Sequence, residues 1–304
     1  MQDLNALSLS ELFLALTADG SLDRLLCAAR AEDLADSGDV TTQSIIHDEW
    51  DVRPAGVARQ AGTIAGLAVI PRLLEVFECD VRFESVASDG EACAAGQVLW
   101  RLLGDLRPIL AVERTMLNLI GRLSGIATLT RRYVDAIAGT TAVICDTRKT
   151  TPGMRFLEKY AIRCGGGTLH RLGLYDAVLF KDNHLQHLGP GEFAPTVAAA
   201  AKAARDRYDL RFVEVEIDTL EQLRLVLEIE PGLIDMVLLD NMSLDQMRDA
   251  VISRDKLAPD VLVEASGAIT LDHVQAVAET GVDRISVGAL THSAPSLDVA
   301  LDLA

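Results

Sequence analysis

Several features that mark other classes of protein are scarce in this sequence. Aromatic residues make up only 4% of its 304 residues, and no apolar run approaches the ~18 residues of a membrane-spanning helix. The five cysteines are odd in number and never spaced as CxxC, so neither a disulfide framework nor a zinc site is indicated. Basic residues are outnumbered, and the formal net charge of −17 argues against nucleic acid or a membrane surface as a partner. The N-terminal stretch is acidic where a signal peptide is basic, so we expect a cytoplasmic protein.

Apolar residues are abundant instead, at 49% of the chain, and Ala, Leu and Val dominate them. This mixture suits helices packed on parallel strands. Residues 9–35 read as helices, and residues 39–42 begin a strand-like section. Short alternating pieces separated by Gly and Asp follow over residues 52–104, interrupted by one short helix, PRLLEVFE. Residues 110–137 then form one long predicted helix, with candidate breaks at two glycines, Gly121 and Gly125.

A repeat of strands and helices begins after this long helix. The predicted strands end near Cys145, Phe180, Val215, Leu239, Val263 and Val287, and from Val215 onward they recur every 24 residues. That period fits a strand, a helix and two short loops. Helix start signals separate the strands, namely Ser243 with Gln246 three residues later and Thr270 before LDHVQAVAET. We therefore predict an α/β fold with an open, incomplete barrel of parallel βα units over residues 123–291. An α+β N-terminal domain over residues 1–122 precedes it, and residues 292–304 are expected to pack on that domain.

The stretch from Asp146 to His184 concentrates positive charge in this acidic protein. Its seven basic residues outnumber its four acidic ones, and they are Arg148, Lys149, Arg155, Lys159, Arg163, Arg171 and Lys181. Two of the predicted strands end in this stretch, and ligands of parallel α/β proteins collect at the C-terminal ends of strands. A local excess of cations at that position indicates a bound anion. Gly165, Gly166 and Gly167 allow the backbone there to approach a ligand or a packed element closely.

The later predicted strands also end in polar groups. Glu214 and Glu216 lie on one side of their strand because side chains alternate, and two buried carboxylates need partners. The next strand ends in Asp240 and Asn241. The last two strands end in Ser266-Gly267-Ala268 and Val287-Gly288-Ala289, where barrel enzymes commonly bind phosphate through backbone N–H groups.

The motifs DTRKTTPG, LEKYA, CGGGTLHRLGLYD and LFKDNH resemble the signature run of the quinolinate phosphoribosyltransferase family. The similarity extends from EDLADSGDVTT through VERTMLNLIGRLSGIATLTRRYV to LLDNM, EASGAIT and SVGALTHSAPSLD. The resemblance implies an open, seven-stranded barrel. It also implies a transferase that converts quinolinate and phosphoribosyl pyrophosphate to nicotinate mononucleotide, pyrophosphate and CO2, with Mg²⁺ as the metal.

The resemblance also implies a role for each matching residue. The two carboxylates of quinolinate would be bound by Arg114, Arg148, His170 and Arg171, next to Thr147. Lys149 and Lys181 would lie at the reacting centre, while Glu216 and Asp240 would hold the ribose or Mg²⁺. The 5′-phosphate would be bound by Ser266, Gly267, Ala268, Val287, Gly288 and Ala289. Arg114 would reach the site of a partner subunit, so the family resemblance implies a homodimer.

Two positions depart from the family pattern. Leu169 stands where a polar residue is usual, and Ala268 stands where Gly or Asn is common. A backbone φ above zero at Ala268 would cost on the order of 1 kcal/mol.

Several other readings stay open at this point. They are a transferase for another aromatic acid, a homologue tied to molybdenum transport, a Schiff-base aldolase using Lys149 or Lys181, and a non-catalytic anion-binding protein. Cys145 and Cys164, which flank the start and middle of the cationic stretch, are candidate nucleophiles, although unpaired cysteines are mostly buried hydrophobes.

Overall fold

The computed structural model describes residues 2–303, which form two compact units. The barrel unit comprises the residues up to Asn5 together with Arg132–Lys149 and Gly167–Gly288. The mixed unit comprises Ala6–Arg131, Thr150–Gly166 and the residues from Ala289 onward. These units interleave along the chain, whereas the domain division predicted between residues 122 and 123 follows chain order and stays a prediction.

The barrel unit contains one parallel sheet, which confirms the predicted α/β class. Across the sheet the strands are β7 (Val143–Cys145), β12 (Arg284–Ser286), β11 (Leu262–Ser266), β10 (Met236–Asp240), β9 (Val213–Ile217) and β8 (Val178–Phe180). The family resemblance implied seven strands, but the described residues form six in this sheet and the barrel is not closed. At the seventh position Thr168 makes a single parallel bridge to Cys145. The bridge extends no further because the backbone N–H of His170, two residues on, donates to the side chain of Asp146 instead (2.7 Å).

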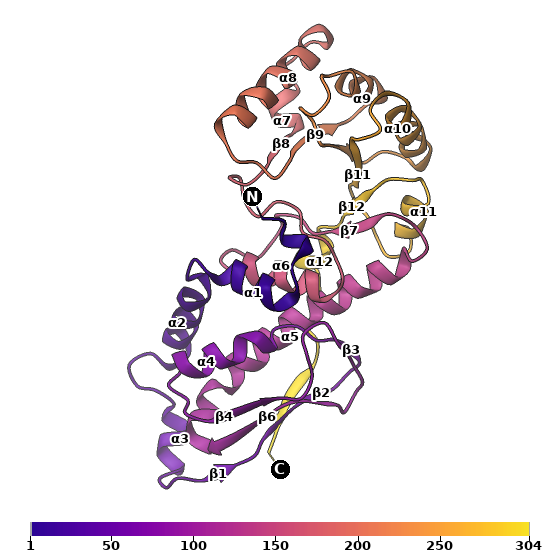
Figure 1. Cartoon of the computed structure of the whole chain (residues 1–304). Coiled ribbons are helices and arrows are strands. Elements are labelled where there is room, and N and C mark those ends of the chain that lie inside the picture. Colours follow the sequence, from indigo (N-terminus) through magenta and orange to yellow (C-terminus); the bar gives the residue numbers. More distant parts are fainter. Residues whose placement is uncertain (1, 304) are drawn as a thin grey trace. The chain divides into compact units, whose positions relative to one another are not determined.

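Helices cover the outer side of this sheet, as Figure 1 shows for the upper part of the ribbon. They are α7 (Asp182–Leu185), α8 (Pro190–Arg207), α9 (Leu220–Leu227), α10 (Leu244–Leu257) and α11 (Val274–Ala278). The predicted capping box at Ser243 and Gln246 is confirmed at the start of α10. The predicted helix start at Thr270 is wrong, because residues 270–273 form a turn in which His273 N–H donates to the Thr270 carbonyl (3.2 Å).

The mixed unit is built on an antiparallel sheet. Its strands are β1 (Asp51–Val52), β6 (Val98–Asp105), β2 (Ala55–Ala58), β13 (Val299–Asp302) and β4 (Arg82–Ser85), with β3 (Gly62–Thr63) and β5 (Ala92–Cys93) as a separate pair. The C-terminal strand β13 pairs with β2. The remaining helices of the chain are η1 (Leu4–Ala6), α1 (Leu9–Thr17), α2 (Ser21–Leu34), α3 (Val40–Ile45), η2 (Leu67–Val69), α4 (Ile70–Val76), α5 (Leu106–Ala136), α6 (Arg155–Cys164) and α12 (Ala289–His292).

Two sequence predictions are wrong in the mixed unit. Residues 39–42 do not begin a strand-like section, because the Asp39 side chain accepts a hydrogen bond from Thr42 N–H (3.0 Å) and so caps α3. Helix α5 is continuous and does not break at its glycines. Gly121 and Gly125 are small for a different reason: a Cβ there would lie 2.9 Å from the Leu297 carbonyl oxygen and 2.0 Å from that of Pro295.

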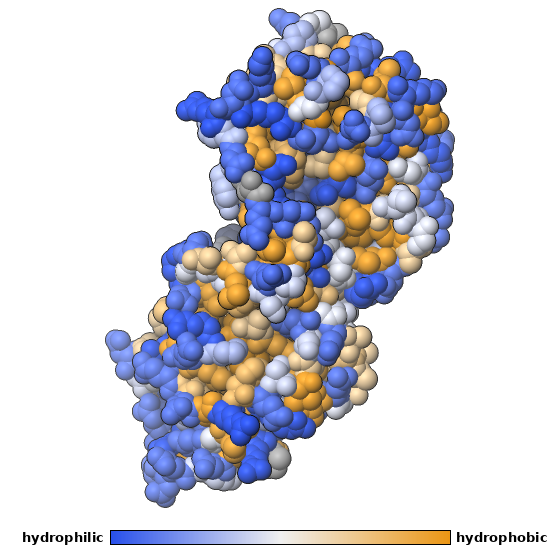
Figure 2. Space-filling view, in the orientation of Figure 1, coloured by the Kyte–Doolittle hydropathy of each residue, from blue (hydrophilic) through white to orange (hydrophobic). Residues whose placement is uncertain are grey.

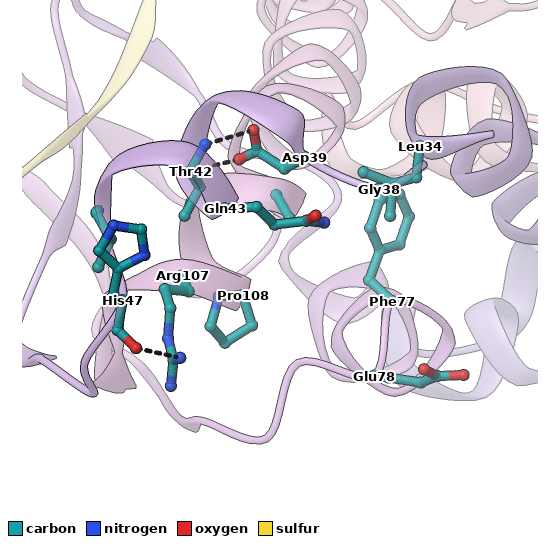
Figure 3. A pocket seen from close by; sticks show the side chains of 12 residues that line it. Leu34, Gly38, Asp39, Thr42, Gln43, His47, Phe77, Glu78, Arg107 and Pro108 are labelled. Atoms are coloured by element: carbon teal, nitrogen blue, oxygen red, sulfur yellow. Dashed lines mark hydrogen bonds between the residues drawn. The ribbon is translucent and has the colours of Figure 1, made fainter. Parts of the chain in front are cut away.

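A pocket of about 480 Å³ lies in the mixed unit, between α3 and the start of α5. Figure 3 shows Thr42 and Asp39 joined by hydrogen bonds at its edge, and Arg107 donating to the His47 carbonyl. Its twelve lining residues include none of the predicted site residues, so this pocket is separate from the cationic stretch. Over residues 2–303, no helix combines the length and apolar character needed to cross a membrane.

Candidate active site

The parallel sheet brings the polar ends of its strands to one edge. In the register of the sheet Ser286 lies opposite Cys145, Ser266 opposite Asp240, and Leu238 opposite Glu216. The segments that follow β7, β8, β11 and β12 therefore leave the sheet on the same side. The predicted residues of the barrel unit that lie at this edge are Thr147, Arg148, Lys149, Lys181, Glu216, Asp240, Ser266, Gly267, Ala268, Val287 and Gly288. Cations and carboxylates thus share the C-terminal edge, as the sequence predicted.

Arg114 and Ala289 belong to the mixed unit. Arg114 is exposed on α5, and Ala289 is the first residue of α12. Their predicted roles in binding remain predictions.

Lys181 and Glu216 form a direct ion pair at this edge. The Lys181 ammonium donates to Glu216 Oε2, and the Asp182 backbone N–H donates to Glu216 Oε1 (3.2 Å). The Glu216 side chain is only 6% exposed, so these partners compensate for removing its charge from water. The sequence predicted that a buried carboxylate of the VEVEI strand needs a partner, and for Glu216 that partner is a cation of the central stretch.

Arg171 is buried close to a second guanidinium. Among the described residues its side chain donates one long hydrogen bond, of 3.5 Å, to the Ala177 carbonyl. Burial and, next in size, the positive charge of Arg148 lower the pKa of Arg171. The carboxylates of Glu214 and Asp176 act in the opposite direction, and an anion bound between the two guanidiniums would offset their repulsion further. This pair is the strongest sign of an anion site in the barrel unit.

The turn after Arg171 is tied down by a buried carboxylate. Asp176 accepts hydrogen bonds from the backbone N–H groups of Leu172 and Gly173, each at 2.8 Å. Before the turn, Leu169 is buried, and its backbone N–H and carbonyl bond the Asn5 side chain at 2.8 and 3.1 Å. The Leu169 side chain, which departs from the family pattern, therefore packs in the interior.

His170 lies inside the barrel unit, with polar groups of the protein close to both ring nitrogens. Nε2 lies 2.9 Å from a Glu214 carboxylate oxygen and 3.4 Å from one of Glu264. Nδ1 accepts a hydrogen bond from the backbone N–H of Arg171 (2.8 Å). The ring also packs edge-on against Phe212, with 5.1 Å between centroids. The segment that bridges β7 thus reaches across to β9 and β11 through this one side chain.

Opposing effects act on the protonation of this ring. Burial lowers the pKa of His170, and the carboxylates of Glu264 and Glu214 raise it by more. The hydrogen bond at Nδ1 favours the neutral ring, because an imidazolium has no nitrogen that can accept. The carboxylates outweigh the opposing effects and raise the pKa of His170 to about 10.

Glu264 has a second buried partner that the sequence reasoning missed. Arg284 Nε donates to Glu264 Oε2 at 2.8 Å, and the two side chains are 12% and 0% exposed. Burial raises the pKa of Glu264, but His170 and Arg284 lower it to about 2. Burial and the charge of Glu264 raise the pKa of Glu214. Side chains alternate along Arg284-Ile285-Ser286, so Arg284 lies on the same side of the strand as Ser286. This alternation was the sequence signal that could have identified Arg284.

The residues that follow β10 and β11 have positive φ angles. Asn241 has φ 52° and donates through Nδ2 to Asp240 Oδ2 (2.7 Å). Gly267 has φ 102°, and a Cβ there would lie 2.1 Å from Asn241 Oδ1, so only glycine fits. Ala268 has φ 36°, in the left-handed region that Ala adopts only at a cost in free energy.

The loop after β12 offers fewer phosphate donors than the sequence implied. The backbone N–H of Val287 donates to the Cys145 carbonyl (3.0 Å), and its side chain is buried. Donors for an anion at this loop must therefore come from residues after Val287. At the end of β7, Thr147 Oγ1 accepts a hydrogen bond from Lys149 N–H (3.0 Å) and shapes that turn.

Neither candidate cysteine is suited to act as a nucleophile. Cys145 and Cys164 are both buried, and burial raises the pKa of each thiol well above its ordinary value. A thiol without thiolate character is unreactive.

Two family models match the chain. The model described as quinolinate phosphoribosyl transferase, C-terminal domain, matches residues 126–302, and the model of the N-terminal domain matches residues 39–124. The chain belongs to the quinolinate phosphoribosyltransferase family.

Curated and solved members of the quinolinate phosphoribosyltransferase family are similar over nearly the whole length. The nicotinate-nucleotide pyrophosphorylase (carboxylating) of Mycobacterium leprae is 46% identical over 274 residues, which cover 90% of this chain and 93% of that protein. The probable enzyme of the same name from Bacillus subtilis is 41% identical over 283 residues, 93% of each. The structure of the nicotinate-nucleotide pyrophosphorylase from Francisella tularensis has a TM-score of 0.84 at 32% identity, covering 100% of both chains.

Proposed function

We propose that this chain transfers a phosphoribosyl group from phosphoribosyl pyrophosphate to quinolinate. The products are nicotinate mononucleotide, pyrophosphate and CO2, in de novo NAD biosynthesis. The observation that carries the proposal is the buried Arg171, which follows the Thr168–Cys145 bridge at the end of β7 and whose guanidinium is acted on by the charge of Arg148. Glu216 and Asp240 lie at the C-terminal ends of β9 and β10 in the same parallel sheet. The names of the full-length relatives support the same reaction.

The acceptor site consists of guanidinium groups. Quinolinate carries two adjacent carboxylates, and each can accept two parallel hydrogen bonds from an arginine. Arg148 and Arg171 supply two such groups in the barrel unit, and the charge of a dianion would offset the repulsion between them. The third arginine in this proposal is Arg114, which is exposed on α5.

The donor site consists of the acidic strand ends and the loop after β11. The half-buried Asp240 carboxylate is oriented by Asn241, and it can bind the ribose hydroxyls or Mg²⁺. Both oxygens of Glu216 already have partners, so Asp240 fits a metal better than Glu216 does. Mg²⁺ typically takes one or two carboxylates plus substrate phosphates, and when bound it would balance the charge of the departing pyrophosphate. Ser266, Gly267 and Ala268 would hold the 5′-phosphate.

The reaction needs electrostatic stabilisation rather than a covalent enzyme intermediate. The bond from ribose C1 to the pyrophosphate oxygen breaks, and the pyridine nitrogen supplies the electron pair of the new bond. Glu216 and Asp240 stabilise the positive charge that develops on the ribose. The C–C bond to the neighbouring carboxylate then breaks, and its electron pair is stabilised by the quaternised nitrogen until a proton replaces CO2. Lys149 and Lys181 lie at the edge where these charges develop.

A homodimer with composite sites is part of the proposal. Large hydrophobic side chains are exposed in both units, among them Ile45 and Trp50 in the mixed unit and Leu174 and Tyr175 just after Arg171. Figure 2 shows a broad patch of hydrophobic residues on the face of the mixed unit that is turned toward the reader. Such patches often mark interaction surfaces. Mixing the inactive variants Arg114→Ala and Lys149→Ala should restore roughly a quarter of the wild-type rate if each site uses both subunits. No recovery would contradict composite sites.

The deciding assay uses the purified protein with phosphoribosyl pyrophosphate and Mg²⁺. We expect CO2 and pyrophosphate in equal amounts with quinolinate, and pyrophosphate release at a far lower rate with nicotinate. Equal rates with quinolinate and nicotinate would mean that the site does not select quinolinate. Absence of pyrophosphate would favour a non-catalytic anion-binding protein. A Schiff-base aldolase that uses Lys181 is disfavoured by the ion pair of this lysine with Glu216, since that chemistry needs a free amine.

A further inference from the structure

The Asn5 side chain binds the backbone directly ahead of the residues assigned to the acceptor. Asn5 lies in η1 and belongs to the barrel unit, 164 residues before Leu169 in the sequence. Its Nδ2 donates to the Leu169 carbonyl (3.1 Å), and its Oδ1 accepts from the Leu169 N–H (2.8 Å). Leu169 is followed at once by His170 and Arg171, which the family resemblance assigns to the acceptor.

These two hydrogen bonds reproduce those of a neighbouring strand. On the side of β7, the Thr168 N–H donates to the Ile144 carbonyl (2.7 Å), and the Thr168 carbonyl accepts from the Asp146 N–H (3.2 Å). Successive residues in a strand direct their backbone groups to opposite sides, so the groups of Leu169 face away from β7. A closed barrel would have another strand on that side. Here the amide of Asn5, which carries both a donor and an acceptor, takes its place.

The segment that leads to Arg171 is therefore held from two sides. Leu169 is only 2% exposed, and a buried N–H or carbonyl without a partner costs free energy. Without Asn5 the segment would keep the bonds of Thr168 to β7 and the bond of the His170 N–H to Asp146 (2.7 Å), all on one side.

A firm backbone matters at this place because two guanidiniums lie close together. The positive charge of Arg148 acts on the buried Arg171, and their repulsion favours a displacement of Arg171 while no anion is bound. A segment held from one side would give way more easily than one held from both. The loss would be felt by the acceptor, which needs both guanidiniums in place.

We propose that Asn5 is a positioning residue, which takes the place of a strand neighbour of Leu169 and thereby holds His170 and Arg171 in place for the acceptor. It acts through the Leu169 backbone. The identity of the acceptor, quinolinate, rests on the proposed function.

The test is Asn5→Ala, which removes both hydrogen bonds to Leu169. We expect the calorimetric affinity for quinolinate to weaken about fivefold, as the loss of two net hydrogen bonds implies. The KM for phosphoribosyl pyrophosphate should stay within about twofold of wild type, because the carboxylates and loops proposed for the donor lie on β9, β10 and β11. Unchanged affinity for quinolinate, or equal losses for both substrates, would overturn the proposal.

The matched control is Ser8→Ala, three residues further along the chain. Ser8 Oγ accepts from the Glu11 N–H (3.3 Å) and caps α1, and among the described residues no hydrogen bond joins Ser8 to Leu169. Loss of a helix cap lowers stability. The thermal midpoint should therefore fall in both variants, whereas the affinity for quinolinate should fall only in Asn5→Ala. An equal loss of affinity in Ser8→Ala would assign the effect to general destabilisation and would overturn the proposal.

A second measurement does not depend on substrate. Amide hydrogen exchange followed by NMR should show the Leu169 N–H protected in the wild-type protein and exchanging at least about tenfold faster in Asn5→Ala. The Thr168 N–H, which donates to Ile144, should change less. Equal exchange of the Leu169 N–H in both proteins would also overturn the proposal. Failure of the wild-type protein to turn over quinolinate would overturn only the proposed function, because exchange is read without it.

Discussion

Replacing Arg284 with Met tests whether the buried ion pair of Arg284 with Glu264 stabilises the barrel unit. The change removes Arg284 from the Glu264 carboxylate, which is 0% exposed, and among the ion pairs of the described residues leaves it the His170 ring at 3.4 Å. Removing one partner of a buried pair costs about 3–5 kcal/mol. We expect a loss near the lower end, about 3 kcal/mol, because His170 still compensates part of the charge. Adding Glu264→Gln to this variant should recover part of the loss, since no buried charge is then left without a partner.

The matched control is Arg248→Met. Arg248 pairs with Asp245 at 2.7 Å, but these side chains are 48% and 93% exposed. An exposed pair is worth less than about 1 kcal/mol. Urea unfolding should be followed by circular dichroism, because Trp50 and Trp100 both lie in the mixed unit and their fluorescence does not report on β11 and β12. Losses that agree within about 1 kcal/mol for the two variants would refute the reasoning.

Three further predictions follow from single residues. Ala268→Gly should raise the free energy of unfolding by about 0.5–1 kcal/mol, because relief of the left-handed backbone at φ 36° outweighs the entropy of glycine; a lower thermal midpoint would contradict this. Lys149→Ala should abolish turnover and leave the circular dichroism spectrum and thermal midpoint unchanged, and a variant with near-normal rate would remove Lys149 from the mechanism. The stabilisation from Glu264 should be complete above pH 4.5 and fade as the pH falls toward 2, because its folded-state pKa is depressed. The difference in unfolding free energy between wild type and Glu264→Gln should therefore shrink between pH 4.5 and 2. A constant difference would count against the ion pairs of Glu264.

The sequence predicted the parts of the fold that depend on local pattern. The period of 24 residues placed β9 to β12 because each unit has its own apolar strand and helix. Alternation placed Glu214 and Glu216 on one side of the strand. In the structure Lys181 and Asp182 bond Glu216, and a Glu214 oxygen lies 2.9 Å from His170 Nε2. The sharing of one sheet edge by Lys181, Glu216 and Asp240 follows from parallel strands alone.

The features that the sequence did not predict depend on contacts between distant segments. Gly121 and Gly125 looked like helix breaks because a close approach by residues 295–297 cannot be read from residues 110–137. The sequence pattern assigned Asp39 to a strand-like section. Its role as the N-cap of α3 depends on the backbone direction of the residues that follow. Arg284 was missed because its meaning depends on Glu264, which lies on a different strand.

The affinity of the protein for quinolinate relative to nicotinate tests the central claim most directly. Quinolinate has two carboxylates for the Arg148 and Arg171 pair and nicotinate has one, so calorimetry should show at least about tenfold tighter binding of quinolinate, a preference that Arg171→Gln removes. Equal affinities for the two acids, or a preference that survives in Arg171→Gln, would contradict the assignment of this arginine pair as the acceptor site.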